Sequence, residues 1–203
     1  RTMAPLKITR VRIIHTNPNG IGLSVVKVES SEPGLYGIEC ATGIRRYKTL
    51  TTAVDEYLAP LLKGKNPDNI EDIWQTVNLS SYWRNGPILN TVLAGLDQAL
   101  WDIKGKCAGL PVYQLLGGKS RFAVECYGHA SGDDFEELAD SVREYREKGF
   151  RHIRNQLGKY GSPDLSGKPD FRKGGYGLAS DTVMEIRPYM KIVPKMFEYI
   201  SSE

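Results

Sequence analysis

A strand-like segment in the last quarter of the chain ends in polar residues that suit acid–base chemistry. Arg154 and Gln156 close the run RHIRNQ, and a long, polar, glycine-rich stretch follows it. Tyr160 is the nearest tyrosine in that stretch, and Tyr176 is the other candidate there. An arginine cation beside a tyrosine lowers the phenol pKa from about 10 towards the working range, so the phenol can exchange protons. A loop aromatic that only shields a site is the alternative interpretation of Tyr160.

Three further polar residues are candidates for substrate contacts. His129 follows a short strand-like segment in the run YGHASG, and Asn17 and Asn19 lie in the turn-rich run HTNPNG. Imidazole and amide groups form hydrogen bonds with hydroxylated ligands. Structural alternatives stay open for all three, because a lone histidine is often a satisfied structural residue and asparagine is common in turns.

Composition argues against several classes of protein. The net charge is +3, from 27 basic and 24 acidic residues mixed along the chain, so we expect no nucleic-acid partner. No apolar run approaches the ~18 residues of a membrane-spanning helix, so we expect no membrane partner. The three cysteines are widely spaced, which argues against a zinc site or a disulfide framework and predicts reduced, mostly buried thiols in a cytoplasmic protein. They are Cys40, Cys107 and Cys126.

The first part of the chain changes from strand-like to helical patterns. Residues 7–15, 21–28 and 35–40 are rich in β-branched residues and are separated by turns, which predicts a three-stranded antiparallel meander. Apolar residues then recur with helical spacing, and this predicts four helices. The expected helices lie at 51–62, 69–79 and 88–107, with a short one inside 109–118.

From residue 121 onward, short strands alternate with helices. Asp133 is the predicted N-cap of the first of these helices, with Glu136 three residues on. Such an order predicts parallel βα units. Two units cannot close or cover a sheet, so they are expected to be an incomplete part of a larger domain. The expected strands lie at 123–127 and 150–155, and the expected helices at 133–148 and 181–200.

Several runs of residues resemble the mandelate racemase/muconate lactonizing enzyme group of the enolase superfamily. They are ALWDIKGK at 99–106 and PVYQLLGG at 111–118. The runs RNGP at 84–87 and YGHASG at 127–132 resemble its D-mannonate dehydratase-like branch in particular. The resemblance implies two regions. Residues 1–120 would be an α+β capping domain, with a three-stranded antiparallel meander plus helices. Residues 121–203 would be the first βα units of a (β/α)₈ TIM-type barrel.

This resemblance implies a Mg²⁺-dependent acid-sugar dehydratase, a lyase that removes the proton α to a carboxylate and then eliminates hydroxide. Arg154 and Tyr160 are then the expected catalytic pair, with Tyr176 as the alternative tyrosine. The expected substrate contacts are His129, Gln156, Asn17 and Asn19. The tyrosine of the branch lies further from the arginine than Tyr160 does. A dehydratase of another C6 acid sugar, such as D-gluconate, therefore stays open, as does a catalytically silent regulatory or binding relative.

In this family three carboxylates at the ends of the third, fourth and fifth barrel strands bind Mg²⁺. Those strands would follow residue 203, so no metal ligand is predicted within the chain. The resemblance implies a parent of about 370 residues or more, and we expect these 203 residues alone to be inactive. A cytoplasmic homo-oligomer is expected, with a small acid sugar as its ligand.

Overall fold

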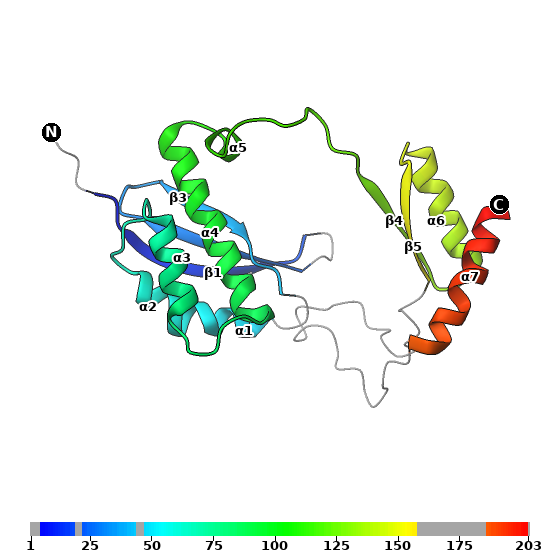
Figure 1. The fold of residues 1–203 in the computed structure, drawn as a ribbon, viewed down its shortest axis with the longest axis horizontal. Coiled ribbons are helices and arrows are strands. Elements are labelled where there is room, and N and C mark those ends of the chain that lie inside the picture. Colours follow the sequence, from blue (N-terminus) through cyan, green and yellow to red (C-terminus); the bar gives the residue numbers. More distant parts are fainter. Residues whose placement is uncertain (1–4, 19–21, 44–46, 158–185, 203) are drawn as a thin grey trace. The chain divides into compact units, whose positions relative to one another are not determined.

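The computed structural model describes residues 5–18, 22–43, 47–157 and 186–202 (Figure 1). The chain divides into two compact units, and the boundary lies between Ser120 and Arg121. None of the helices within the described ranges is long and apolar enough to cross a membrane.

The first unit begins with an antiparallel sheet. Its strands are β1 (Ile8–Thr16), β2 (Leu23–Ser30) and β3 (Tyr36–Cys40), hydrogen-bonded in the order β1-β2-β3. The register places Val11 opposite Val28. Alternate residues of the central strand are buried, as expected for a sheet with one covered face. The predicted three-stranded meander is confirmed.

A continuous helical stretch follows the sheet and contains one π-helical segment. It runs through α1 (Tyr47–Thr52), the π segment η2 (Ala53–Leu58) and α2 (Ala59–Leu62), so it begins before the predicted position 51. Ala59 donates its backbone hydrogen bond to Val54, five residues back. Pro60, the next residue, has no N–H to donate, which interrupts the regular α-helical pattern here.

The remaining helices of this unit are α3 (Ile70–Leu79), α4 (Pro87–Ala108) and α5 (Val112–Leu115), close to their predicted places. Helix α4 packs on β2 and β3, with α3 beside it (Figure 1). Most of the apolar stripe of α4 is buried against the sheet, but Leu89, in its first turn, is exposed. Leu61 on α2 is also exposed.

The second unit contains β4 (Tyr127–Gly132), α6 (Phe135–Glu147), β5 (His152–Leu157) and α7 (Ile186–Ser202). Strands β4 and β5 pair in parallel, and α6 is the crossover between them. The predicted parallel arrangement is therefore confirmed. Ala130, Leu138, Val142 and Met196 form the buried cluster between sheet and helices.

Both strands of this unit lie later in the chain than the sequence predicted. Residues 123–126 are not a strand, and β4 instead consists of the small-residue run YGHASG. The reason lies in the packing of α6. A Cβ on Gly128 would lie 2.4 Å from the ring of Tyr145, and one on Gly132 would lie 2.3 Å from the backbone nitrogen of Leu138. Glycine at these positions permits a close approach of the helix that larger strand-forming residues would block.

The N-cap of α6 also lies one residue later than predicted. Asp134 accepts a hydrogen bond from the backbone N–H of Glu137 at 2.8 Å. The Glu137 carboxylate in turn accepts from the backbone N–H of Asp133 at 2.9 Å. This is a capping box formed by Asp134 and Glu137, and not by Asp133 and Glu136.

The expectation that the cysteines are mostly buried is wrong. All three cysteines are free but exposed, because Cys40 ends β3, Cys107 lies in the last turn of α4 and Cys126 precedes β4. On α7, Met196 is buried, whereas Met190 and Phe197 are exposed.

Candidate functional site

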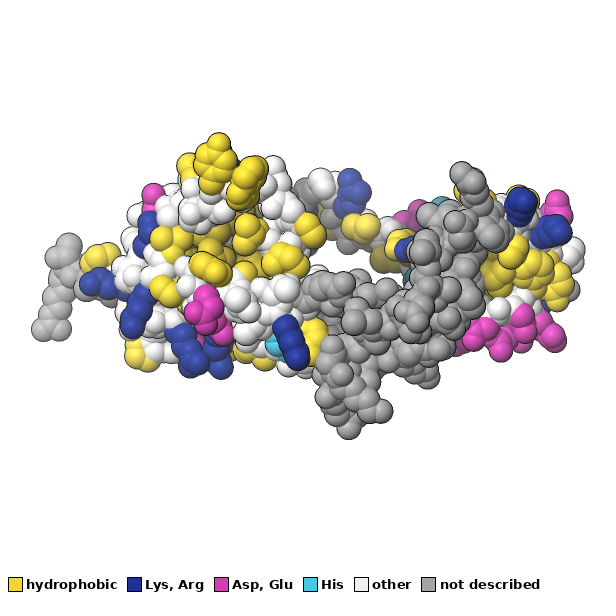
Figure 2. Space-filling view, turned by 90° about the horizontal axis from the view of Figure 1, so that it is seen from below, with side chains coloured by type: hydrophobic (Ala, Val, Ile, Leu, Met, Phe, Trp, Pro, Cys, Tyr) yellow, Lys and Arg dark blue, Asp and Glu magenta, His cyan; other side chains and the backbone are white. Residues whose placement is uncertain are grey.

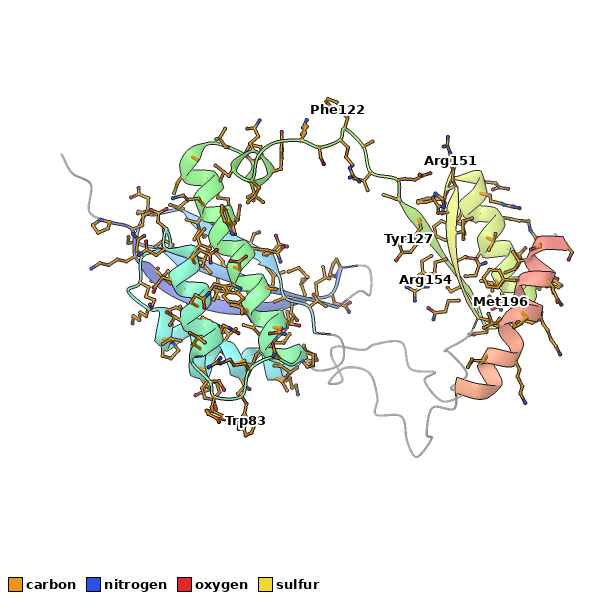
Figure 3. All side chains as sticks on the ribbon, in the orientation of Figure 1. Trp83, Phe122, Tyr127, Arg151, Arg154 and Met196 are labelled. Carbon is orange, nitrogen blue, oxygen red and sulfur yellow. The ribbon has the colours of Figure 1, made fainter. Side chains whose placement is uncertain are left out.

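The candidate site lies on the face of the β4–β5 sheet that points away from α6. Gly128 and Ala130 are buried on the helix side, and Tyr127, His129 and Ser131 alternate with them on the other side. Register partners in a parallel pair share a face, so Arg154 lies beside His129 and Gln156 beside Ser131. Figure 3 shows Tyr127 and Arg154 projecting from the side of the sheet opposite α6 and α7.

His129 and Gln156 are in direct contact on this face. The imidazole Nε2 of His129 lies 3.0 Å from Oε1 of Gln156. When Nε2 carries the proton, the imidazole donates this hydrogen bond and its Nδ1 is left as an acceptor. The structure thus joins two predicted substrate-binding residues that lie 27 positions apart in the sequence.

Arg154 lies next to this pair and is exposed. Its guanidinium is a fixed cation with a planar fork of donors, which matches the geometry of a carboxylate. The two tyrosines considered as its partner, Tyr160 and Tyr176, lie outside the described residues. The catalytic pair of Arg154 and Tyr160 therefore stays a prediction.

The strand residues on this face include no carboxylate. They are Tyr127, His129, Ser131, His152, Arg154 and Gln156. His152 lies at the start of β5, where its Nε2 is 3.2 Å from Glu125 Oε1 just before β4. From the middle of the strands to their C-terminal ends, the face thus combines the Arg154 guanidinium with imidazole, amide and hydroxyl groups that form hydrogen bonds. It is suited to bind an anion that carries hydroxyl groups.

Sequence reasoning missed the placement of Tyr127 and Ser131 on the same face as His129. The alternation of small residues in YGHASG is the signal that was available: Gly128, Ala130 and Gly132 mark one face, and the three larger side chains mark the other. The signal is weak because glycine, alanine and serine are not residues typical of strands.

The candidate substrate contacts in the first unit are only partly described. Asn17 follows β1 directly and is exposed, whereas Asn19 lies outside the described residues. Asn17 belongs to the first unit, and the β4–β5 face belongs to the second. Their role as substrate contacts stays a prediction.

His15, near the end of β1, has a structural role. Its Nδ1 lies 2.9 Å from Ser24 Oγ on β2, and its Nε2 lies 2.7 Å from Thr51 Oγ1 on α1. Its ring also packs edge-on against Tyr47 at 4.9 Å. Burial lowers the pKa of His15 below its ordinary value, and the Asp55 carboxylate opposes that shift. His15 therefore links two strands and a helix.

Within the described ranges, no cluster of three histidine, cysteine, aspartate or glutamate side chains is arranged to hold a metal ion. The two acidic residues of α4, Asp97 and Asp102, lie in different surroundings and do not form a metal site together. Asp102 Oδ2 accepts hydrogen bonds from the backbone N–H of Ile38 at 3.0 Å and from Lys106 Nζ at 2.6 Å. Asp97 is partly buried, and its pKa is raised by that burial and by the nearby Glu71 carboxylate.

A family model, curated relatives and solved structures all match this chain. Residues 2–117 match the family model of the N-terminal domain of mandelate racemase and muconate lactonizing enzyme. A D-galactonate dehydratase family member from Musicola paradisiaca is 46% identical over 218 residues, which cover 99% of this chain and 51% of that protein. Another, from Catenulispora acidiphila, is 53% identical over 197 residues, with 95% and 44% covered.

Among solved structures, an enolase from Pantoea ananatis with bound D-gluconate and Mg superposes with a TM-score of 0.81. It is 45% identical, and the match covers 97% of this chain and 50% of that one. The chain thus spans about half the length of the relatives that it matches.

Proposed function

Because the chain belongs to the mandelate racemase/muconate lactonizing enzyme family of the enolase superfamily, we propose that the protein is a Mg²⁺-dependent acid-sugar dehydratase. In this proposal residues 1–120 are the capping domain and residues 121–203 are the start of the (β/α)₈ barrel. The proposal includes a cytoplasmic location and a homo-oligomeric assembly. The whole reaction belongs to the full-length protein, since this chain spans about half of its relatives.

One observation supports this reaction class most directly. The face of β4 and β5 that the helices leave open carries His129, Arg154 and Gln156 side by side, with no carboxylate among its strand residues. In (β/α)₈ barrels, the catalytic groups lie at the C-terminal ends of the strands. Gln156 is the next-to-last residue of β5, and His129 and Arg154 lie in the middle of their strands. An acid sugar offers what this face would bind, a carboxylate beside several hydroxyl groups.

The proposed reaction breaks the C–H bond α to the carboxylate and the C–O bond at the neighbouring carbon. A C=C bond forms between the two carbons, and the proton and hydroxide leave as water overall. Arg154 would stabilise the phenolate form of Tyr160, so that the tyrosine can accept or return a proton near neutral pH. His129 and Gln156 would hold the substrate by its hydroxyl groups, with the imidazole oriented by its contact with the amide.

The described residues do not form a set of oxygen ligands for Mg²⁺. In the proposal the metal is held by barrel residues that follow this chain. When bound, it supplies positive charge at the substrate carboxylate, which makes the α-proton more acidic. The residues of this chain would bind and orient the hydroxylated part of the substrate and would transfer protons.

D-mannonate is the proposed substrate, on the resemblance of the RNGP and YGHASG runs to that branch of the family. D-gluconate is the second candidate, because a structural neighbour that is 45% identical was solved with D-gluconate and Mg. D-galactonate belongs in the same comparison, because several relatives carry it in their family name.

Turnover of an acid-sugar panel tests the proposal. The full-length protein would be incubated with Mg²⁺ and D-mannonate, D-gluconate or D-galactonate, and the dehydrated keto acid would be measured. We expect product from at least one of the first two acids and no product once the metal is chelated. No turnover of any aldonic or aldaric acid would contradict the dehydratase and favour a silent binding relative.

A further inference from the structure

The third strand of the first sheet, β3, lies at an edge of that sheet. Among the described elements it pairs with β2 alone, so one of its sides has no strand beside it. Tyr36 and Ile38 on this strand are 38% and 43% exposed, and Figure 2 shows hydrophobic side chains gathered on one face of the same unit. An exposed apolar strand whose edge is open can pair with a strand of another chain, which leads to aggregation. The backbone groups at this edge therefore need partners other than a strand.

Two side chains of α4 bind backbone groups at this edge. The N–H of Ile38 donates to Asp102 Oδ2 at 3.0 Å, and the C=O of Tyr36 accepts from Lys106 Nζ at 2.7 Å. Lys106 Nζ also donates to Asp102 Oδ2 at 2.6 Å, so the two side chains hold each other in place. Tyr36 and Ile38 lie two positions apart in β3, and alternate residues of a strand direct their backbone groups to the same side. The two contacts therefore close neighbouring groups of one edge.

Further charged groups lie along the same strand. The N–H of Cys40, at the end of β3, donates to the Glu39 carboxylate at 2.8 Å. Two ammonium groups lie near the ring of Tyr36, with Lys27 Nζ 4.0 Å and Lys106 Nζ 4.7 Å from its centroid. Charged side chains at an edge, lysine above all, are a common protection against strand pairing.

A close approach of α4 brings these side chains to the edge. A Cβ on Gly37 would lie 1.8 Å from the backbone oxygen of Ala99, so only glycine allows the helix to come this near to β3. Asp102 and Lys106 follow Ala99 by about one and two helical turns, so they lie on the same side of α4. All three residues belong to the run ALWDIKGK at 99–106. Neither the apolar core nor the candidate site accounts for Asp102 and Lys106.

The other edge of the sheet, along β1, is covered in a different way. At the start of β1, the N–H of Ile8 donates to the C=O of Lys65, and the N–H of Gly64 donates to the C=O of Ile8, both at 2.8 Å. Backbone groups after α2 thus cover part of one edge, and side chains of α4 cover part of the other.

We infer that Asp102 and Lys106 keep the edge of β3 closed to strand addition, with Glu39 extending the closed stretch to Cys40. The excluded partner is an extended segment of another chain, such as β3 of a second copy. Such a strand could reach the N–H of Ile38 only by displacing Asp102. Hydrogen bonds of a carboxylate or an ammonium group are stronger than those between neutral backbone groups, so this displacement is unfavourable. It would also take the backbone partners away from two charged groups.

Hydrogen exchange of the full-length protein, resolved to the Ile38 amide, tests whether Asp102 closes the edge. Asp102→Ala removes the acceptor of this amide, whereas Asp102→Asn keeps an oxygen that can accept from it. Lys104→Met is the matched control, because Lys104 lies on the same helix but forms its salt bridge with Asp68, at 2.8 Å. We expect Ile38 to exchange at least about tenfold faster in Asp102→Ala, and at the wild-type rate in Lys104→Met. Asp102→Asn should lie between them, and unchanged exchange of the β2 amides would show that the fold is intact.

Light scattering of the concentrated full-length protein tests strand addition itself. The double variant Asp102→Ala/Lys106→Met opens both backbone groups and keeps the apolar part of the lysine side chain. We expect it to form assemblies larger than that of the wild type at least about tenfold faster, while Lys104→Met behaves as the wild type. If circular dichroism shows that the double variant does not fold, Lys106→Met alone provides the same comparison.

Two results would overturn the inference. One is wild-type exchange of Ile38 in Asp102→Ala, since another segment would then cover the edge. The other is a folded variant with faster exchange that associates no faster than the wild type, since the contacts would then not prevent strand pairing. Neither measurement depends on turnover, so the dehydratase proposal is tested separately.

Discussion

The two sheets of the chain differ in the types of polar residue that their outer faces carry. On the outer face of the first sheet, Glu29 lies between Arg12 and Lys27, with N–O distances of 3.1 and 3.3 Å. On the open face of the second sheet, the strand residues include Arg154 and His129 but no carboxylate. On the first face the Glu29 carboxylate offsets the charges of Arg12 and Lys27. The strand residues of the second face combine a guanidinium with imidazole, amide and hydroxyl groups, which suits this face to an anionic ligand that carries hydroxyl groups.

The two units also differ in the size of their cores. Among the described residues, the first unit has a cluster of nineteen buried hydrophobic residues, and the second has a cluster of four. Burial of apolar area is the main stabilising contribution to folding. We therefore expect substitutions in the core of the first unit to act on stability, and substitutions on the open face of β4–β5 to act on catalysis.

The largest expected effect concerns the tyrosine that would work with Arg154. Tyr160→Phe keeps the aromatic ring but removes the ionisable hydroxyl, so it should lower kcat of the full-length enzyme at least about 100-fold. Its thermal stability and metal binding should stay unchanged. Steady-state kinetics on the best substrate of the panel would measure the effect.

Tyr176→Phe is the matched control for Tyr160→Phe. If Tyr176→Phe is inactive and Tyr160→Phe is normal, the pairing with Arg154 involves the other tyrosine. Normal turnover in both variants would show that neither tyrosine is the acid–base group.

A core substitution in the first unit should lower the stability of the protein and leave its kcat unchanged. Leu100, on α4, is 1% exposed. Leu100→Ala should lower the free energy of unfolding by about 2–5 kcal/mol, because it removes buried methyl groups and leaves a cavity. The kcat of the folded fraction should not change. Urea unfolding measures the loss of stability, with Leu116→Ala at an exposed position as the control. A lower kcat for fully folded Leu100→Ala would contradict the expectation that core substitutions in the first unit leave catalysis unchanged.

Adding one methyl group to β4 should disturb its packing on α6. Gly128→Ala places a Cβ 2.4 Å from the ring of Tyr145, and overpacking of this kind costs about 1–3 kcal/mol. Tyr145→Leu removes the ring, so the double variant should be more stable than the sum of the single effects predicts. A double-mutant cycle by urea unfolding measures this coupling, and strict additivity would show that the ring does not limit the approach of the helix.

The cap of α6 allows a direct comparison of two neighbouring aspartates. Asp134→Ala removes the side-chain acceptor of the Glu137 N–H and should cost about 1 kcal/mol. Asp133→Ala should cost less than about 0.5 kcal/mol, since the Asp133 contribution to the capping box comes from its backbone. A larger loss of stability in Asp133→Ala than in Asp134→Ala, measured by thermal unfolding, would favour Asp133 as the N-cap, as the sequence predicted.

The smallest expected effect is a pH dependence at His15. Its folded-state pKa is below the ordinary value of 6.5, so the unfolded chain binds the proton more tightly. The stability that His15 contributes is therefore present above pH 6.5 and is lost as the pH falls below it. His15→Gln retains hydrogen-bonding groups without a titration, so its stability should fall less between pH 7.5 and pH 5. If the free energy of unfolding fell equally with pH in the wild type and in His15→Gln, His15 would not be the source of this pH dependence.

Much of the fold could be predicted because its elements follow simple periodic patterns. The meander and the long stripe of α4 are examples, and the parallel order of β4 and β5 followed from alternating strands and helices. The position of β4 could not be predicted, because Gly128 and Gly132 are selected by the closeness of α6 and not by strand propensity.

The sequence named candidate site residues one by one but did not show that some of them share a face. His129 and Gln156 were both identified, yet their contact depends on a parallel register that places β4 and β5 side by side. Local pattern does not specify such a register, because it is set by the burial of the opposite face against α6.

The most direct test of the central claim compares two neighbouring residues of β5 that lie on opposite faces. Arg154→Met removes the cation from the open face, and Ile153→Val alters the face that packs on the helix cluster. The measurement is kcat/KM of the full-length enzyme for D-mannonate and D-gluconate, with the thermal midpoint of each variant. The account predicts at least about a 100-fold loss for Arg154→Met at an unchanged midpoint, and near-normal kcat/KM for Ile153→Val with a slightly lower midpoint. Wild-type kcat/KM in Arg154→Met would contradict it.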